Sequence, residues 1–274
     1  MLGTDLTLAL AGRDVTALGR SDLDITDRAA VDAAVAGHDV VINAAAYTRV
    51  DDAETHESEA RATNATGAGL LADAARRNDA RLVQISTDYV FDGTATSPYA
   101  EDAPRHPVSA YGRTKAEGEA LVLAAHPEGS FIVRTAWLYG ANGPNFAKTM
   151  RRLAVDRSEL AVVNDQLGQP TWTRDLAQAI VAMLDADAPV GIYHGTNSGE
   201  ASWFDFARAV FTEAGLDPER ITATDSASFV RPAPRPAYSV LGHDAWGTAG
   251  LEPLRDWRYA LREAAKSGAT DPAG

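Results

Sequence analysis

The chain has 274 residues, a net charge of −13 at pH 7 and no cysteine. This length suits one large α/β domain with a smaller lobe, and the lack of cysteine excludes disulfides and thiolate chemistry. The acidic balance argues against nucleic acid and anionic membrane as partners. We expect no transmembrane helix and no signal peptide, because no long apolar run and no basic leader occur. The lack of cysteine makes a cytoplasmic location the simplest expectation.

The first half of the sequence alternates helix patterns with strand patterns. Helices are predicted at residues 4–11, 64–77 and 111–125, and another runs from a cap at Asp27 to Val35. Short apolar runs predict strands at residues 14–18, 39–43, 81–86 and 130–134. This alternation predicts a doubly wound, Rossmann-type parallel sheet with helices on both faces.

The alternation is looser after Gly140. Helices are predicted at residues 146–153, 173–184 and 202–214, the last capped by Ser202, and strands at 160–163 and 191–194. We therefore expect a dinucleotide-binding domain of residues 1–140, to which residues 160–195 add a strand and a helix. A small C-terminal substrate lobe is expected from residues 141–159 and 196–266, followed by a frayed tail at 267–274.

The beginning of the sequence departs from the order of a dinucleotide-binding sheet. Such a sheet opens with a strand, then a Gly-rich turn, then a helix. Here a predicted helix comes at once, and Gly3 stands where the last glycine of the turn would stand. We expect that the first strand and the phosphate-binding loop, roughly ten residues, are missing from this sequence. A misassigned start and a truncated gene are both open as explanations.

Tyr111 and Lys115 are the first candidates for catalysis. A spacing of four residues places both side chains on one face of a helix. A nearby ammonium stabilises a phenolate and lowers the pKa of a tyrosine, so the pair suits proton transfer to a carbonyl oxygen during hydride addition. The alternative is an exposed Tyr and Lys on an ordinary helix, because this spacing is common.

Two further segments follow predicted strands. Ser86, Thr87 and Asp88 come at the end of one strand, and ligands of parallel sheets bind at the carboxyl ends of the strands. Residues 43–46 (Asn-Ala-Ala-Ala) end another, and their small side chains allow a flat ligand to approach the backbone. The alternatives are local hydrogen bonds at a strand end and tight packing of a helix on a strand.

Six motifs in a fixed order carry a resemblance to a known family: residues 43–46, 86–91, 111–115, 134–139, 145–150 and 164–170. With them the chain, from about Gly3 to Leu261, resembles the dTDP-4-dehydrorhamnose reductases, which are extended short-chain dehydrogenases/reductases. The resemblance implies NADPH-dependent reduction of the 4-keto group of dTDP-4-dehydro-6-deoxy-L-mannose to dTDP-L-rhamnose.

The resemblance also implies roles for the matching residues. Tyr111 would donate the proton, Lys115 would hold the nicotinamide ribose and lower the pKa of Tyr111, and Thr87 would orient the substrate carbonyl. Contacts with the sugar nucleotide are expected from Asp88, Trp137 and Asn145, although a core aromatic is the alternative for Trp137. Contacts with the cofactor are expected from Gly3, Asp24, Ile25, Ala44, Ala45, Ala46, Tyr47 and Thr48.

Three arginines are candidates for binding phosphate. Arg20 follows the strand predicted at 14–18, where NAD-specific sites place an acid, so we expect it to meet the 2′-phosphate of NADPH. Asp22 and Asp24 lie close by, which leaves NADH as the alternative cofactor. Arg231 and Arg235, in a Pro-rich segment, are candidates for the substrate diphosphate, with surface salt bridging as the alternative.

A metal site is not predicted. Some members of this family hold Mg²⁺ between subunits through glutamates, but the matching positions here are Asp5 and Arg174. An arginine has no lone pair to offer a cation.

Two alternative functions are open. Another reductase or epimerase of NDP-keto sugars would use the same scaffold, and similar chains serve as NADP-binding regulatory subunits of methionine adenosyltransferase. Intact Thr87, Tyr111 and Lys115 favour catalysis. We expect a dTDP-sugar as the partner and leave a homodimer open.

Overall fold

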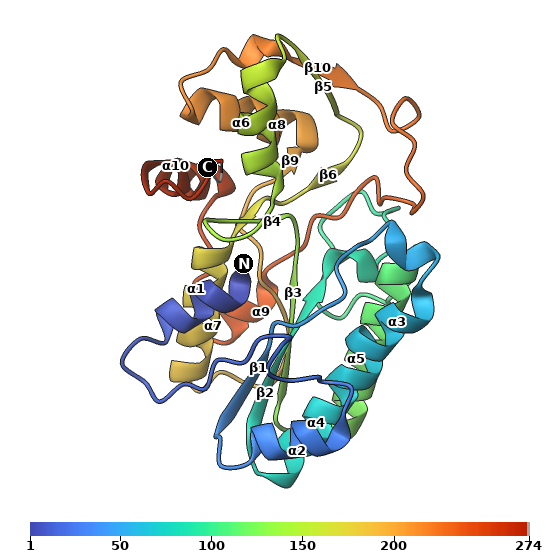
Figure 1. The fold of residues 1–274 in the computed structure, drawn as a ribbon, viewed down its shortest axis with the longest axis vertical. Coiled ribbons are helices and arrows are strands. Elements are labelled where there is room, and N and C mark those ends of the chain that lie inside the picture. The colour runs from blue at the N-terminus through green and yellow to red at the C-terminus, as the bar shows by residue number, and fades with distance from the viewer. Residues whose placement is uncertain (273–274) are drawn as a thin grey trace.

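The computed structural model describes residues 1–272, and its centre is a four-stranded sheet in the order β1-β2-β3-β8 (Figure 1). The strands are β1 (Val40–Asn43), β2 (Arg81–Thr87), β3 (Ser130–Thr135) and β8 (Gly191–His194). Every neighbouring pair is parallel. The chain must therefore cross over after each strand, and the carboxyl ends of all four strands meet at one edge of the sheet.

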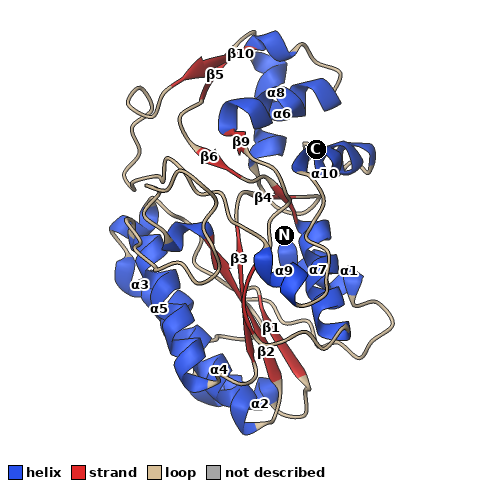
Figure 2. Cartoon of the chain, turned by 180° about the vertical axis from the view of Figure 1, so that it is seen from behind, coloured by secondary structure: helices blue, strands red, loops and turns tan. Residues whose placement is uncertain are grey.

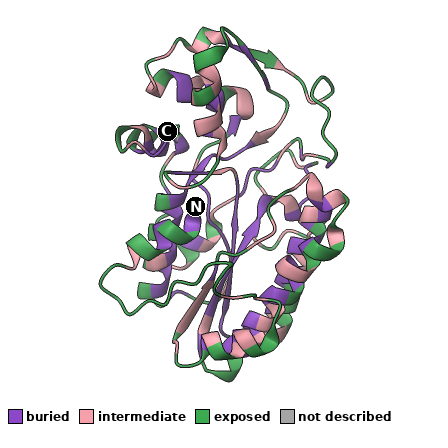
Figure 3. Cartoon of the chain, viewed as in Figure 1, coloured by how far each residue is buried: buried purple, intermediate pink, exposed green. Residues whose placement is uncertain are grey.

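Helices cover both faces of this sheet (Figure 2). One face carries α1 (Leu2–Ala9), α7 (Thr173–Asp185) and α9 (Asp244–Thr248), and the other carries α2 (Arg28–Val35), α4 (Ala68–Arg77) and α5 (Ala110–Ala125). The helices are held by apolar stripes, such as Leu2 and Leu6 of α1, which are buried in one cluster with Leu176 and Ile180 of α7. Their outer faces are exposed (Figure 3).

Short elements connect these layers on the α5 side. Helix α3 (Glu57–Arg61) runs into a π-helical turn, η2 (Ala62–Gly67), which continues directly as α4. Single 3₁₀ turns follow two of the strands: η1 (Asp52–Glu54) after β1 and η3 (Asp88–Val90) after β2. A third, η4 (Pro218–Arg220), lies in the smaller lobe described next.

A smaller lobe stands beyond the carboxyl edge of the sheet (Figure 1). Its helices are α6 (Phe146–Asp156), α8 (Trp203–Glu213) and α10 (Trp257–Lys266), and they share one apolar core with the parallel pair β5 (Leu160–Val163) and β10 (Ile221–Thr224). Two short pairs join lobe and sheet: β4 (Leu138–Tyr139) with β7 (Thr171–Trp172), and β6 (Leu167–Gly168) with β9 (Ala201–Ser202).

Most of the predicted elements are confirmed, with ends that move by a few residues. Asp27 caps α2 by accepting hydrogen bonds from the amides of Ala29 and Ala30. Ser202 caps α8 in a reciprocal capping box with Asp205. The doubly wound α/β architecture with a C-terminal lobe is therefore the one the sequence predicts.

The strand predicted at residues 14–18 is wrong. This segment forms no strand, and Val15 and Leu18 are 39% and 46% exposed. The reason lies in β1, which is the edge of the sheet and pairs only with β2 among the described residues. A strand forms only where a neighbour accepts and donates its backbone hydrogen bonds. A first strand and a Gly-rich turn beside β1 stay a prediction.

The predicted division into domains needs three changes. Strand β8 and helix α7 join the sheet as predicted for residues 160–195, but β5 pairs with β10 in the lobe. Helix α9, predicted as part of the lobe, buries Trp246 in the core of the sheet domain. The tail is packed rather than frayed over its described part, because Ala269 and Thr270 are buried and Arg151 bonds the Thr270 hydroxyl at 2.9 Å. Residues 273–274 lie outside the described residues.

Candidate active site

Helix α5 brings Tyr111 and Lys115 to the end of β2. Ser109 caps this helix by accepting the amide of Gly112 at 3.1 Å. A Cβ atom on Gly112 would lie 2.2 Å from the carbonyl oxygen of Tyr89, and one on Gly118 would lie 2.1 Å from that of Asn64. The two glycines therefore let α5 approach the backbone that follows β2 and the π-turn before α4 more closely than any other residue would allow.

Thr87 and Asp88 form a hydrogen-bonded pair where β2 ends. The Thr87 hydroxyl donates to Oδ1 of Asp88 at 2.9 Å and accepts the amide of Tyr89 at 3.2 Å. Both side chains are buried, and Oδ2 of Asp88 has no hydrogen-bond partner among the described residues. Burial raises the pKa of Asp88 to about 6, against the lowering effect of the hydrogen bond from Thr87. A buried acceptor without a partner marks a place where a ligand donor would be stabilising.

Tyr111 and Lys115 are both buried at the end of β2, and burial shifts both of their pKa values. The Lys115 ammonium donates to the carbonyl oxygen of Ile85 at 2.6 Å, and burial lowers its pKa to about 8 while Glu119 acts to raise it. Burial raises the pKa of Tyr111 above its usual value, the Thr87 hydroxyl opposes this, and the charge of Asp88 adds to it. Lys115 is not among the groups that shift the pKa of Tyr111 in this arrangement, and a lowering of that pKa by Lys115 stays a prediction. Tyr111 keeps its proton at neutral pH, which is the form a proton donor needs.

A buried ionic cluster lies behind Lys115, and sequence reasoning missed it. Glu119 follows Lys115 by one helical turn and accepts two hydrogen bonds from Arg134 of β3, at 3.0 and 2.8 Å. Ser86 donates to the same carboxylate at 2.5 Å, and Arg105 lies 3.4 Å away. This cluster ties the catalytic helix to the ends of β2 and β3. The spacing of Tyr111, Lys115 and Glu119, each four residues apart, was the available sequence signal.

The segment after β1 crosses the same edge of the sheet. The side chain of Asn43 donates to Gln84 of β2 at 2.8 Å, and its oxygen accepts the amide of Ala45 at 3.1 Å. Asn64, in the π-turn η2, binds the backbone of Tyr47 through both its oxygen and its nitrogen, at 2.8 and 3.1 Å. Single π-turns often occur at functional sites, and this one fixes the path of the segment predicted to contact the cofactor. Within that segment Ala44, Ala45 and Thr48 are exposed, and Ala46 and Tyr47 are half-buried.

The remaining predicted cofactor residues lie near the N-terminus. Gly3 is inside α1, and nothing lies within 4 Å of the place where its Cβ would be. Arg20 and Asp24 are exposed, and the Asp24 carboxylate is occupied by the amide and hydroxyl of Thr26, which lower its pKa. Ile25 packs on Gly67, where a Cβ would lie 2.8 Å from its side chain. Their contacts with a cofactor stay predictions.

Trp137 and Asn145 come from the connection between sheet and lobe. Trp137 has φ +45, a strained conformation for a non-glycine residue. Its ring stacks on that of Trp203, with 3.6 Å between the ring centroids. Gly168 leaves room for the indole of Trp137, because a Cβ on Gly168 would lie 2.6 Å from it. Asn145 caps α6 by accepting the amide of Lys148 and donates to the carbonyl of Gly140. Asn145 thus has a structural role that the sequence did not predict.

Arg231 and Arg235 converge on one carboxylate, that of Asp51. Arg231 lies 3.0 and 2.6 Å from Oδ2, and Arg235 lies 2.9 Å from Oδ1. The two guanidinium groups and the amide of Ala233 hold the pKa of Asp51 below its usual value, although burial, the largest influence, acts in the opposite direction. The Pro-rich segment is therefore fastened to the loop after β1.

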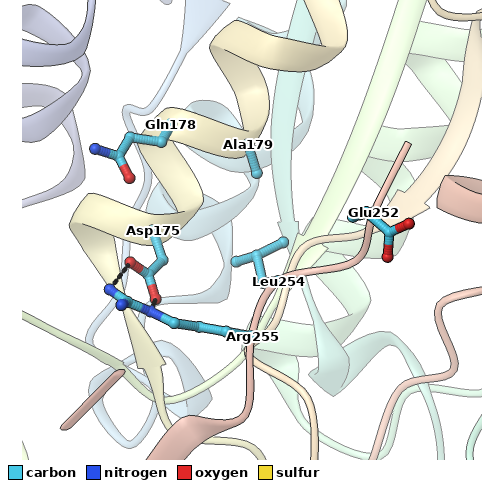
Figure 4. A pocket seen from close by; sticks show the side chains of 6 residues that line it. All are labelled: Asp175, Gln178, Ala179, Glu252, Leu254 and Arg255. Atoms are coloured by element: carbon cyan, nitrogen blue, oxygen red, sulfur yellow. Dashed lines mark hydrogen bonds and ion pairs between the residues drawn. The ribbon is translucent and has the colours of Figure 1, made fainter. Parts of the chain in front are cut away.

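A separate cavity of about 320 Å³ lies between α7 and residues 252–255 (Figure 4). Arg255 and Asp175 form a two-point ion pair on its wall, at 2.8 and 2.7 Å. None of the predicted site residues lines this cavity. Its position and its internally paired charges separate it from the candidate active site.

The positions matched to the metal site hold other interactions. The Asp5 carboxylate accepts a hydrogen bond from Thr173, and Arg174 lies over the ring of Trp172 at 5.6 Å. Residues 1–272 contain no group of three or more potential metal ligands. Over the same range, no helix has the length and apolar character that crossing a bilayer requires.

A parallel sheet with a Tyr-x-x-x-Lys helix beside its strand ends is the arrangement expected of a short-chain dehydrogenase/reductase. The sequence profile described as the RmlD substrate binding domain matches residues 1–269. The chain therefore belongs to the RmlD family.

Named relatives are similar over almost the whole chain. A dTDP-4-dehydrorhamnose reductase of Streptomyces griseus is 52% identical and is aligned over 96% of this chain and 89% of its own. A probable dTDP-4,6-dihydroxy-2-methyloxan-3-one 4-ketoreductase of Streptomyces antibioticus is 53% identical and is aligned over 96% of this chain and 91% of its own. The crystal structure of dTDP-4-dehydrorhamnose reductase from Bacillus anthracis in complex with NADP superposes with a TM-score of 0.93 and 37% identity. The superposition covers 97% of this chain and 95% of that one.

Proposed function

We propose that this protein reduces the 4-keto group of dTDP-4-dehydro-6-deoxy-L-mannose to give dTDP-L-rhamnose. NADPH is the hydride donor, with NADH as the alternative. One observation carries the proposal: Tyr111 and the Thr87 hydroxyl share the carboxyl edge of the sheet with Lys115, whose ammonium makes a single hydrogen bond within the described residues. An ammonium has three donors, so two remain for the ribose hydroxyls of a dinucleotide.

In the proposed mechanism, NADPH supplies the hydride when bound, and the chain supplies the proton. Tyr111 gives its phenolic proton to the carbonyl oxygen as negative charge develops there. The Thr87 hydroxyl carries one proton, which it now donates to Asp88. To orient the substrate carbonyl it must rotate away from Asp88, so Thr87 and Asp88 act as one unit. Trp137, Arg231 and Arg235 bind the sugar nucleotide.

The sugar is the part of the proposal that most needs a test, because relatives of equal identity carry different sugar names. The experiment follows NADPH absorbance with a panel of dTDP-4-keto-6-deoxy sugars and identifies each product by NMR. The proposal expects the highest kcat/KM with dTDP-4-dehydro-6-deoxy-L-mannose. Preference for another sugar would assign another reductase of this class. NADPH binding without turnover of any member would favour the regulatory-subunit alternative.

We also propose a cytoplasmic location, consistent with a chain that has no cysteine. A homodimer is the assembly to test against a monomer, by light scattering.

A further inference from the structure

Asp51 joins the two parts of the molecule next to the candidate active site. It lies in the loop between β1 and η1, and its partners Arg231, Ala233 and Arg235 lie in the Pro-rich segment between β10 and α9. Both carboxylate oxygens are used, one by each arginine. A single carboxylate thus fixes the positions of two cations, an arrangement that no local sequence pattern predicts.

The two arginines are bound in different ways. Arg231 gives Nε and Nη2 to Asp51, and its side chain is 46% exposed. Arg235 gives only Nη2, and its side chain is 18% exposed. Its Nη1 is buried and has no hydrogen-bond partner among the described residues. A buried cationic donor without an acceptor is costly, so its presence points to an acceptor that the ligand provides.

The free Nη1 belongs to a guanidinium that borders the catalytic residues. The Arg235 guanidinium lies over the ring of Tyr89, 5.8 Å from its centroid. The rings of Tyr89 and Tyr111 are T-shaped to each other, with 5.7 Å between their centroids. Pro236 is packed on Gly93 so closely that a Cβ on Gly93 would lie 2.6 Å from it. The backbone that carries Arg235 is therefore held against the chain that follows β2.

We propose that Asp51 is a positioning residue for substrate binding: it holds Arg235 so that the free Nη1 bonds the diphosphate of the nucleotide sugar. The more exposed Arg231 binds the other oxygen of the same carboxylate and helps to hold it in place. This inference rests on the proposed function, because it takes a nucleoside diphosphate as the anion. A guanidinium with one edge fixed by a carboxylate presents its other donors in a defined direction, which favours phosphate oxygens.

The experiment measures binding of dTDP and dTMP by calorimetry, apart from turnover, in the full chain. Asp51→Asn keeps the size of the side chain and removes its charge. Arg235→Lys keeps the charge of the cation and removes its planar fork. Asp185→Asn is the matched control, because Asp185 also takes a two-point bond from an arginine, Arg13, at 2.8 and 2.7 Å on the surface.

We expect Asp51→Asn and Arg235→Lys each to weaken dTDP binding about tenfold or more, as the loss of a charge-assisted hydrogen bond implies. Binding of dTMP should weaken less, and Asp185→Asn should bind dTDP as wild type does. In turnover, KM for the nucleotide sugar should rise while kcat and NADPH affinity stay within about twofold. Arg231→Ala should raise this KM less than Arg235→Ala does.

Three results would overturn the inference: wild-type dTDP affinity in Asp51→Asn, a parallel loss of NADPH affinity, or an equal loss in Arg231→Ala and Arg235→Ala. Because Arg235→Lys leaves Asp51 in place, it decides the matter if Asp51→Asn fails to fold. Tight dTDP binding without turnover of any keto sugar would refute the proposed function and leave this inference standing.

Discussion

The burial of Lys115 makes the stability of the folded protein depend on pH. The Lys115 side chain is buried, and burial lowers its pKa from 10.5 to about 8. The unfolded chain therefore binds more protons than the folded chain between about pH 8 and pH 10.5, and stability rises with pH across this window. The shift corresponds to about 3 kcal/mol in full, of which about 2 kcal/mol is recovered between pH 7 and pH 9.5.

The perturbation that tests this is Lys115→Met, which removes the charge and keeps an unbranched side chain. Urea unfolding at pH 7 and pH 9.5 gives the change in the free energy of unfolding for both proteins. We expect the wild type to gain about 2 kcal/mol more than the variant does. An equal gain in both proteins would show that Lys115 is not desolvated as the structure indicates.

Three further predictions concern the reaction and the cofactor. Tyr111→Phe should lower kcat by roughly 10² or more with little change in NADPH affinity; near wild-type turnover would remove Tyr111 as the proton donor. The wild type should have a higher kcat/KM with NADPH than with NADH, and Arg20→Ala should lose this preference; a variant that keeps it would exclude Arg20 as the contact for the 2′-phosphate. A strand and Gly-rich turn fused before Met1 should pair with the open edge of β1, raising the melting temperature and NADPH affinity; two unchanged values would argue against a first strand there.

The sheet could be predicted from the sequence where a strand is apolar on both faces. Leu82 and Val83 of β2, and Phe131 and Ile132 of β3, are fully buried, so the pattern of the sequence and the environment agree. Residues 14–18 have a similar pattern and form no strand. Pairing depends on a neighbour, and a local pattern carries no information about whether that neighbour exists. Strand β5 was predicted from its apolar pattern, but that pattern does not say which strand will be its neighbour, and β5 pairs with β10 in the lobe.

The site could be predicted only where spacing along one element reports it. Tyr111 and Lys115 lie one helical turn apart, and Thr87 ends an apolar strand. Arg134 meets Glu119 across 15 residues, and Asp51 meets Arg235 across 184, which no local pattern shows. The hydrogen bond from the Lys115 ammonium to the carbonyl of Ile85 likewise depends on how α5 packs on β2, which the spacing of Tyr111 and Lys115 does not report.

The same two clusters explain how an acidic chain can bind an anionic substrate. Asp51 lies between Arg231 and Arg235, and Glu119 lies between Arg134 and Arg105, so cations outnumber the carboxylate in each. Lys115 adds a further positive charge at the end of β2, where Asp88 also lies, and the carboxylates of Asp51 and Glu119 keep the arginines in place. The net charge of −13 belongs largely to exposed side chains, whose effect falls off within about 8 Å at physiological ionic strength. The local surplus of cations, rather than the overall charge, therefore sets the potential that a diphosphate meets at the strand ends.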